Sequence, residues 1–143
     1  MDLGERFSMA LHGTARAWRQ AVDRRLKYLG LSQASWLTIA VAARAPQPLS
    51  QSELADQLGV EGATMVAMVD RLVRAGLVKR EVQPSDRRVK RVVLTEAGYR
   101  LHDQVKAEAA AVRTELLANV DRADLETATR LLEELQSMIA TVS

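Results

Sequence analysis

Apolar residues recur at spacings of three and four along the first thirty residues of the chain. Such spacing places their side chains on one face of an α-helix, where they can pack together. We therefore predict a helix over residues 5–29, ended by Gly30. The stripe comprises Phe7, Leu11, Ala15, Trp18, Val22, Leu26 and Leu29.

The last third of the chain carries two more stripes of the same kind. The first predicts a long helix that begins after Thr95, and the second predicts a final helix that Asp121 can cap. The first stripe comprises Leu101, Val105, Ala109, Val112 and Leu116, and the second comprises Leu125, Ala128, Leu132, Leu135 and Ile139.

Shorter elements occupy the middle of the chain. Ser32 can cap a helix that runs to about Arg44, where a proline-containing break follows. Residues 50–53, Ser-Gln-Ser-Glu, form a capping box that starts a short helix ending near Leu58. A glycine-containing turn then leads to a helix over residues 61–75. Two short helices joined in this way are typical of a helix-turn-helix.

A β-hairpin follows directly. Residues 77–82 and 89–94 are predicted to be strands, and residues 83–86 have the composition of a turn. The predicted fold is therefore mainly α with a small β-hairpin wing. Residues 32–95 form a winged helix-turn-helix lobe, and the segments 1–30 and 96–143 add helices at either end.

The terminal helices carry long apolar stripes but have little chain to cover them. That excess of apolar surface predicts a partner, most simply a second copy of the same chain. A two-fold dimer would present two helix-turn-helix units to DNA half-sites about one helical turn apart. We accordingly treat residues 1–143 as a single domain whose terminal helices dimerise.

Positive charge is concentrated in the hairpin. The formal net charge of the chain is only +2, yet residues 79–95 hold six basic and two acidic side chains. A dense basic segment is the expected footprint of a polyanion contact. A solvated basic hairpin is the alternative, and the position of this hairpin after a helix-turn-helix favours DNA.

The composition narrows the remaining classes of function. The chain has no cysteine, which excludes disulfides and thiolate metal sites and is compatible with the cytoplasmic location that we expect. No apolar run is long enough to span a bilayer. His12 and His102 are the only histidines and neither lies in a catalytic motif. We expect neither an enzyme nor a cofactor or metal site.

The second helix of the pair offers side chains for DNA contacts. If Val66, Val69 and Val73 face the core, then Thr64, Met68 and Arg71 face the groove, with Ala67 beside them. Thr64 could contact a phosphate or a base, and Met68 could touch a thymine methyl group.

The hairpin tip offers a cluster of cations. Strand alternation sends Arg88 and Lys90 to one side and Arg87 to the other. An arginine at a hairpin tip can enter a narrow minor groove, where the potential is most negative. Asp86 would be repelled by phosphates, so we expect it to pair with a neighbouring arginine and fix its direction.

A small-molecule site is a separate possibility. Trp18 and Trp36 lie on predicted helices near arginines, and packing in the core is their default role. The alternative is an apolar cavity with an arginine such as Arg16 at its edge, which would suit an aromatic carboxylate.

Several of these motifs resemble those of the MarR family of winged-helix transcriptional regulators, most closely its SlyA-like branch. The segment 54–78, with Asp-Arg-Leu at 70–72 and Gly-Leu-Val at 76–78, is similar to the helix-turn-helix of the family. The wing signature is Asp86-x-Arg88 followed by Leu-Thr-x-x-Gly at 94–98. The SlyA-like N-terminal pattern is matched by Trp18-Arg19, Asp23, Arg25-Leu26-Lys27 and Leu31-x-Gln33-x-x-Trp36.

This resemblance implies an obligate homodimer that binds double-stranded DNA at a pseudo-palindromic operator. It implies that Arg88 enters the minor groove, that Asp86 orients Arg88, and that Arg87 assists at the backbone. It also implies a pocket for small aromatic anions between the dimerisation helices and the winged-helix lobe, with Arg16 and Trp36 at positions that line it.

The sequence departs from the family pattern at two positions. Ala67 stands where the family often has a base-reading arginine, so either the operator differs or the wing carries more of the binding. Ala40 stands where SlyA-like members can offer a histidine to the pocket. The leading hypothesis is a DNA-binding regulator, and the resemblance adds release by an aromatic anion as an expectation. The alternative is a winged-helix module whose basic hairpin contacts an acidic protein.

Overall fold

The computed structural model describes residues 1–142, apart from the side chain of Arg87. The described chain forms two compact units, one comprising residues 1–110 and the other beginning at Ala111. Within the described residues, no helix has the length and apolar composition needed to cross a membrane.

Helix α1 (Leu3–Arg25) opens the first unit, and Asp2 caps it by accepting a hydrogen bond from the backbone N–H of Glu5. Because α1 ends at Arg25, the predicted helix over residues 5–29 is interrupted near its end. A short 3₁₀ turn (Lys27–Leu29) follows, and Gly30 ends it with φ 69°. This left-handed conformation suits glycine, which has no Cβ to clash.

Helix α2 (Gln33–Arg44) begins at the predicted cap, because the Ser32 hydroxyl accepts from the backbone N–H of Ser35. Helix α3 (Gln51–Leu58) starts with the predicted capping box, in which Ser50 and Glu53 exchange hydrogen bonds with one another's backbone N–H groups. Gly59, with φ 68°, ends α3, and helix α4 (Gly62–Arg74) follows.

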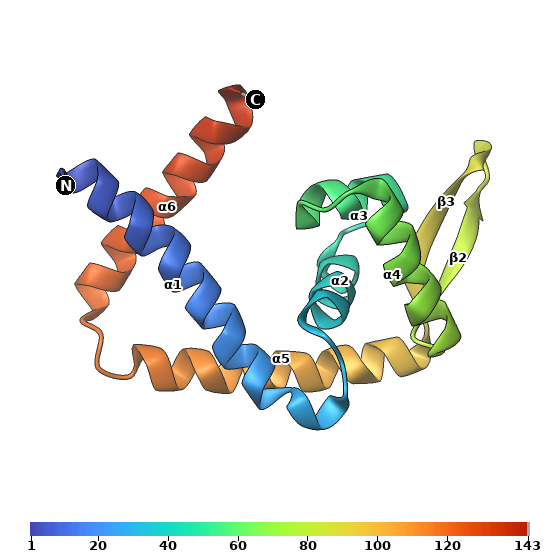
Figure 1. Ribbon diagram of the computed structural model, residues 1–143, viewed down its shortest axis with the longest axis horizontal. Coiled ribbons are helices and arrows are strands. Elements are labelled where there is room, and N and C mark those ends of the chain that lie inside the picture. Colours follow the sequence, from blue (N-terminus) through green and yellow to red (C-terminus); the bar gives the residue numbers. More distant parts are fainter. Residues whose placement is uncertain (143) are drawn as a thin grey trace. The chain divides into compact units, whose positions relative to one another are not determined.

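The hairpin consists of β2 (Val78–Gln83) and β3 (Asp86–Leu94), paired antiparallel. Strand β3 begins three residues earlier than predicted, because its pairing with β2 continues to the turn across an irregularity at Val82–Gln83. A short strand that the sequence did not predict, β1 (Leu49–Ser50), pairs with the other edge of β3. The strand order is β1-β3-β2, and the hairpin tip extends beyond α3 and α4 (Figure 1).

One apolar core joins the helix-turn-helix to the sheet. Helix α4 supplies four of its side chains, and α2, α3 and the strands supply the rest. Burial of this shared core fixes α4 against the base of the hairpin. Its members are Ile39, Leu54, Ala55, Met65, Met68, Val69, Leu72, Val78, Val92 and Leu94.

The junction between the hairpin and helix α5 (Glu96–Leu117) explains the Leu-Thr-x-x-Gly pattern. The hydroxyl of Thr95 accepts from the backbone N–H of Gly98 at 3.1 Å and donates to the carbonyl of Gly76. A Cβ at position 98 would lie 2.1 Å from the carbonyl oxygen of Leu77. Only glycine allows this close approach of α5 to the α4–β2 turn.

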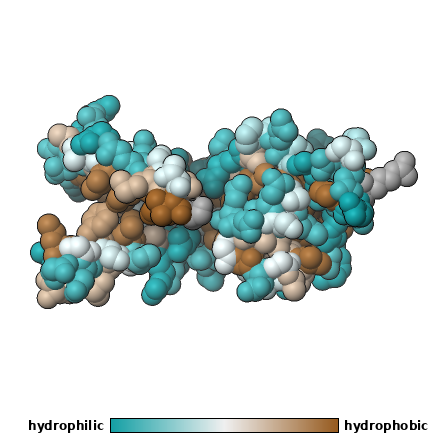
Figure 2. Space-filling view, turned by 90° about the horizontal axis from the view of Figure 1, so that it is seen from above, coloured by the Kyte–Doolittle hydropathy of each residue, from teal (hydrophilic) through white to brown (hydrophobic). Residues whose placement is uncertain are grey.

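Helix α6 (Arg122–Val142) belongs to the second unit, and the predicted cap Asp121 accepts from the backbone N–H groups of Ala123 and Asp124. Exposed apolar side chains lie on α6, and others lie on α1; Figure 2 shows apolar atoms at the surface among hydrophilic ones. The large exposed apolar residues are Leu3, Phe7, Met9 and Leu11 on α1, and Leu131, Leu132, Met138, Ile139 and Val142 on α6.

Candidate nucleic-acid interface

The buried face of α4 differs from the one that the sequence predicted. Val69 is buried as expected, but Val66 and Val73 are 42% and 38% exposed. Met68, expected to face the groove, is only 4% exposed. The prediction of an outward-facing Met68 is therefore wrong. Methionine adapts to irregular gaps in a core, and the buried face of α4 is built on Met65, Met68 and Leu72 as well as Val69.

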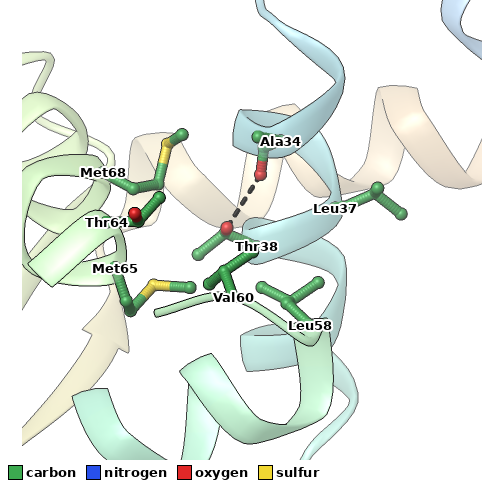
Figure 3. A pocket seen from close by; sticks show the side chains of 8 residues that line it. All are labelled: Ala34, Leu37, Thr38, Leu58, Val60, Thr64, Met65 and Met68. Atoms are coloured by element: carbon green, nitrogen blue, oxygen red, sulfur yellow. Dashed lines mark hydrogen bonds between the residues drawn. The ribbon is translucent and has the colours of Figure 1, made fainter. Parts of the chain in front are cut away.

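Figure 3 shows Met65 and Met68 directed from α4 toward α2. They line a small apolar cavity of about 90 Å³ between α2, the α3–α4 turn and α4. The Ser35 hydroxyl donates to the sulfur of Met68 at 3.4 Å, and the Thr38 hydroxyl is bound to the carbonyl of Ala34. The remaining lining residues are Leu37, Leu58, Val60 and Thr64.

The opposite face of α4 is open to solvent. Thr64 and Arg71 are exposed, as the sequence predicted, and lie along one edge of a surface formed by Ala63, Ala67 and Arg74. The helical period places these three small or basic positions on one side of α4, away from the methionines.

One acidic residue on this face is neutralised from the hairpin. The guanidinium of Arg80, on β2, donates to Oδ1 of Asp70 at 2.6 Å. It also donates to the side-chain oxygen of Gln51 at 2.7 Å and to the carbonyl of Val66 at 3.4 Å. Arg80 thus joins β2 to the start of α3 and to the middle of α4. The sequence does not predict this role, because only the position of a basic residue before the turn can be read from it.

The wing places Asp86 against Arg88, as predicted. Oδ1 of Asp86 accepts from the backbone N–H of Arg88 at 3.0 Å and from its Nε at 3.2 Å. These two bonds hold the pKa of the Asp86 carboxyl below its ordinary value, and the backbone bond has the larger effect. The Arg88 side chain is 91% exposed, so its charge faces solvent beside a fixed carboxylate.

Lys90 and Arg91, on β3, differ in exposure. Lys90 is exposed on β3. The side chain of Arg87 lies outside the described part of the chain, so its predicted role stays a prediction. Arg91 is directed back to the body of the lobe, where it bonds the carbonyl of Pro48 and approaches Glu53 at 3.8 Å.

The predicted ligand residues lie on neighbouring helices but do not line the cavity described above. Arg16 is exposed on α1. Trp36 is 5% exposed, and its indole N–H donates to Oδ1 of Asp23 at 3.0 Å, which ties α2 to α1. The default core role of this tryptophan therefore has a hydrogen bond to support it.

Among the described residues, no three side chains of His, Asp or Glu cluster in a way that could hold a metal ion. His12 is exposed on α1. His102 lies on α5, where burial and the nearby charge of Lys106 lower its pKa.

A helix-turn-helix followed by a basic antiparallel hairpin, with both built on one core, defines a winged-helix protein. Residues 29–89 match the sequence profile of the MarR family. The crystal structure of the transcriptional regulator PA3341 is 38% identical, with a TM-score of 0.86 over 94% of this chain and 98% of that one. The chain belongs to the MarR family of transcriptional regulators.

Two further structures show the same arrangement. A MarR-family regulator from Rhodococcus sp. RHA1 is 25% identical, with a TM-score of 0.81 over 94% of this chain and 95% of that one. CouR from Rhodococcus jostii RHA1, crystallised with p-coumaroyl-CoA, is 27% identical, with a TM-score of 0.79 over 94% of each chain.

Proposed function

We propose that this chain is a sequence-specific DNA-binding regulator that acts as a homodimer on a pseudo-palindromic operator. The observation that carries the proposal is the wing, in which a fixed carboxylate holds an exposed arginine at the end of a basic hairpin. The hairpin comes directly after α4 in the chain, and the two elements pack on the same apolar core. The exposed face of α4 and the hairpin can therefore contact the same duplex.

In this proposal the wing binds the minor groove. Arg88 enters the groove, where narrow A·T-rich segments have the most negative potential. Asp86 aims Arg88, and Arg87 and Lys90 neutralise nearby phosphates. Each neutralised phosphate releases condensed counterions, which contributes roughly 0.9 to the log–log dependence of affinity on salt.

Helix α4 enters the major groove in the same complex. Thr64 and Arg71 lie along one edge of its exposed face and contact the backbone or base edges. Beside them, the exposed residues Ala63, Val66 and Ala67 present small apolar surfaces, which suit the methyl group of thymine. Met68 has no place in this readout because it is buried.

Homodimerisation accounts for the exposed apolar residues of the terminal helices. Phe7 and Met9 are 39% and 64% exposed on α1, and Met138 is 60% exposed on α6. Side chains of this kind are buried when helices of two copies pack. Sedimentation equilibrium tests this part directly: a dimer mass is expected at micromolar protein, and a monomer mass would overturn it.

A small aromatic carboxylate modulates DNA binding in this proposal. Two observations support it: CouR, a similar regulator, was crystallised with an aromatic acyl-CoA, and Arg16 is an exposed cation on α1 close in sequence to Trp18. Salicylate-like anions should quench tryptophan fluorescence saturably and weaken the DNA complex. No response at millimolar concentration would remove the ligand without affecting the DNA-binding proposal.

The DNA-binding proposal is tested by mobility shift with the promoter region of the chain's own gene. A retarded complex that survives excess random-sequence competitor is expected. Loss of the complex at low competitor would contradict sequence-specific binding, and it would favour the alternative in which the hairpin contacts an acidic protein.

A further inference from the structure

The strongest unassigned feature is Arg80, because one side chain contacts three segments. From β2 it donates to Gln51 at the first residue of α3, and to Asp70 and the Val66 carbonyl in the middle of α4. Its side chain is 22% exposed, whereas that of its neighbour Lys79 is 61% exposed. We propose that Arg80 is a positioning residue for DNA binding, which joins the wing to α4 and neutralises Asp70 on the DNA-facing surface.

The first part of this role is mechanical. A guanidinium is planar and presents several N–H donors in a fixed fork, so it can hold three acceptors at once. Arg80 lies on the strand that leads to the hairpin turn, and its partners lie on the two helices of the helix-turn-helix. The separation of α4 from the wing is therefore fixed by more than the apolar core. A protein that reads two grooves at once needs that separation fixed before it binds.

The second part is electrostatic. The helical period places Asp70 on the same side of α4 as Ala63, Ala67 and Arg74, and its side chain is 44% exposed. An isolated carboxylate on this side would repel DNA phosphates. The Arg80 guanidinium at 2.6 Å supplies the opposing charge and also occupies Oδ1 as an acceptor. This part rests on the proposed function, since it matters only if α4 approaches DNA.

The mechanical part has a test that needs no DNA. Because the chain has no cysteine, Ala67→Cys and Val82→Cys can be spin-labelled as a pair, one on α4 and one on β2. The distribution of label distances should be narrow in the parent protein and broader when Arg80→Met is added. Lys79→Met, which removes one charge from the adjacent exposed position of β2, should leave the distribution unchanged. Equal widths for Arg80→Met and the parent would contradict the proposal that Arg80 fixes α4 relative to the wing.

The electrostatic part is tested with a duplex selected by the wild-type protein. Arg80→Met should weaken binding about tenfold or more, a loss expected when a charged partner is removed from a close pair. Asp70→Asn, added to Arg80→Met, should recover part of that affinity because it removes the uncompensated carboxylate. Lys79→Met should weaken binding less than Arg80→Met.

The outcomes separate the two proposals. Absence of any selected duplex would refute the proposed function. The label distances would still show whether Arg80 fixes α4 relative to the wing. A selected duplex bound equally well by Arg80→Met and wild type would overturn the positioning role. A failure of Asp70→Asn to recover affinity would overturn the electrostatic part. If Arg80→Met does not fold by circular dichroism, Arg80→Lys takes its place. It keeps the charge but cannot hold three acceptors, so broader label distances with a smaller loss of affinity are expected.

Discussion

Asp86 accepts three hydrogen bonds from Arg88, two residues further along the chain. One comes from the backbone N–H at 3.0 Å, and two come from the guanidinium, at 3.2 Å to Oδ1 and 3.5 Å to Oδ2. The backbone bond fixes the carboxylate at the start of β3, and the carboxylate in turn orients the guanidinium. The cation at the tip of the wing is therefore aimed by a residue whose own charge would repel DNA.

Arg88→Ala should weaken operator binding by about 1–3 kcal/mol if Arg88 makes a specific groove contact. Arg122→Ala is a matched control, since both side chains are 91% exposed and both pair with a carboxylate, but Arg122 lies on α6. Fluorescence anisotropy with labelled duplex measures both variants. Equal affinities for Arg88→Ala and Arg122→Ala would show that the wing assignment is wrong.

The Asp86–Arg88 contact should persist in mildly acidic solution. Hydrogen bonds from Arg88 lower the Asp86 pKa, so the carboxylate stays ionised below its ordinary range, and the contact is lost only as the pH falls through the lowered value. Carboxyl-carbon chemical shifts followed by NMR give this titration. In Arg88→Ala the backbone N–H remains, so the pKa should rise only in part. A titration of Asp86 above its ordinary value in the wild type would refute the contact.

Gly98→Ala should destabilise the protein by about 1–3 kcal/mol, as overpacking does. The added Cβ would meet the carbonyl oxygen of Leu77 at 2.1 Å, and backbone cannot give way as a flexible side chain can. Gly13→Ala is the matched control, because a Cβ there meets nothing within 4 Å inside α1. In that helix interior alanine should stabilise by about 0.5–1 kcal/mol. Urea unfolding measures both, and a neutral Gly98→Ala would contradict the close approach.

The helices were predictable because their signals are local. The capping box at Ser50 and Glu53 is present, and Gly30 and Gly59 end their helices with positive φ. Strand β1 was not predictable, since two residues carry no periodicity and pair with β3 only through the tertiary fold.

The site was predictable only in part. The sequence predicts that Asp86 pairs with a neighbouring arginine, because such a contact is local, and the family resemblance implies that this arginine is Arg88. The buried face of α4 differs from the predicted one because Val66, Val69 and Val73 fit a helical period as well as Met65, Met68 and Leu72 do. The contacts of Arg80 cannot be predicted from the sequence because its acceptors lie 10 to 29 residues away along the chain.

Protein stability should fall as the pH drops below neutrality, in part because of His102. Burial, then the charges of Lys106 and Arg44, lower its pKa from 6.5, while Asp103 opposes them. Between the lowered value and 6.5 the unfolded chain binds more protons, so the free energy of unfolding decreases as the pH falls through that window. His102→Gln should reduce this dependence in denaturant titrations at several pH values. His12→Gln, on exposed α1, is the control, and an equal effect of both would contradict the prediction.

The central claim is that two copies of this winged helix bind a two-fold-related DNA sequence. Selection of bound sequences from random duplex DNA by the purified protein tests DNA binding, symmetry and spacing together. We expect an enriched pseudo-palindrome whose half-site centres are about one helical turn, roughly 10 base pairs, apart. Absence of enrichment, or an enriched site with a single unrepeated half, would contradict the claim.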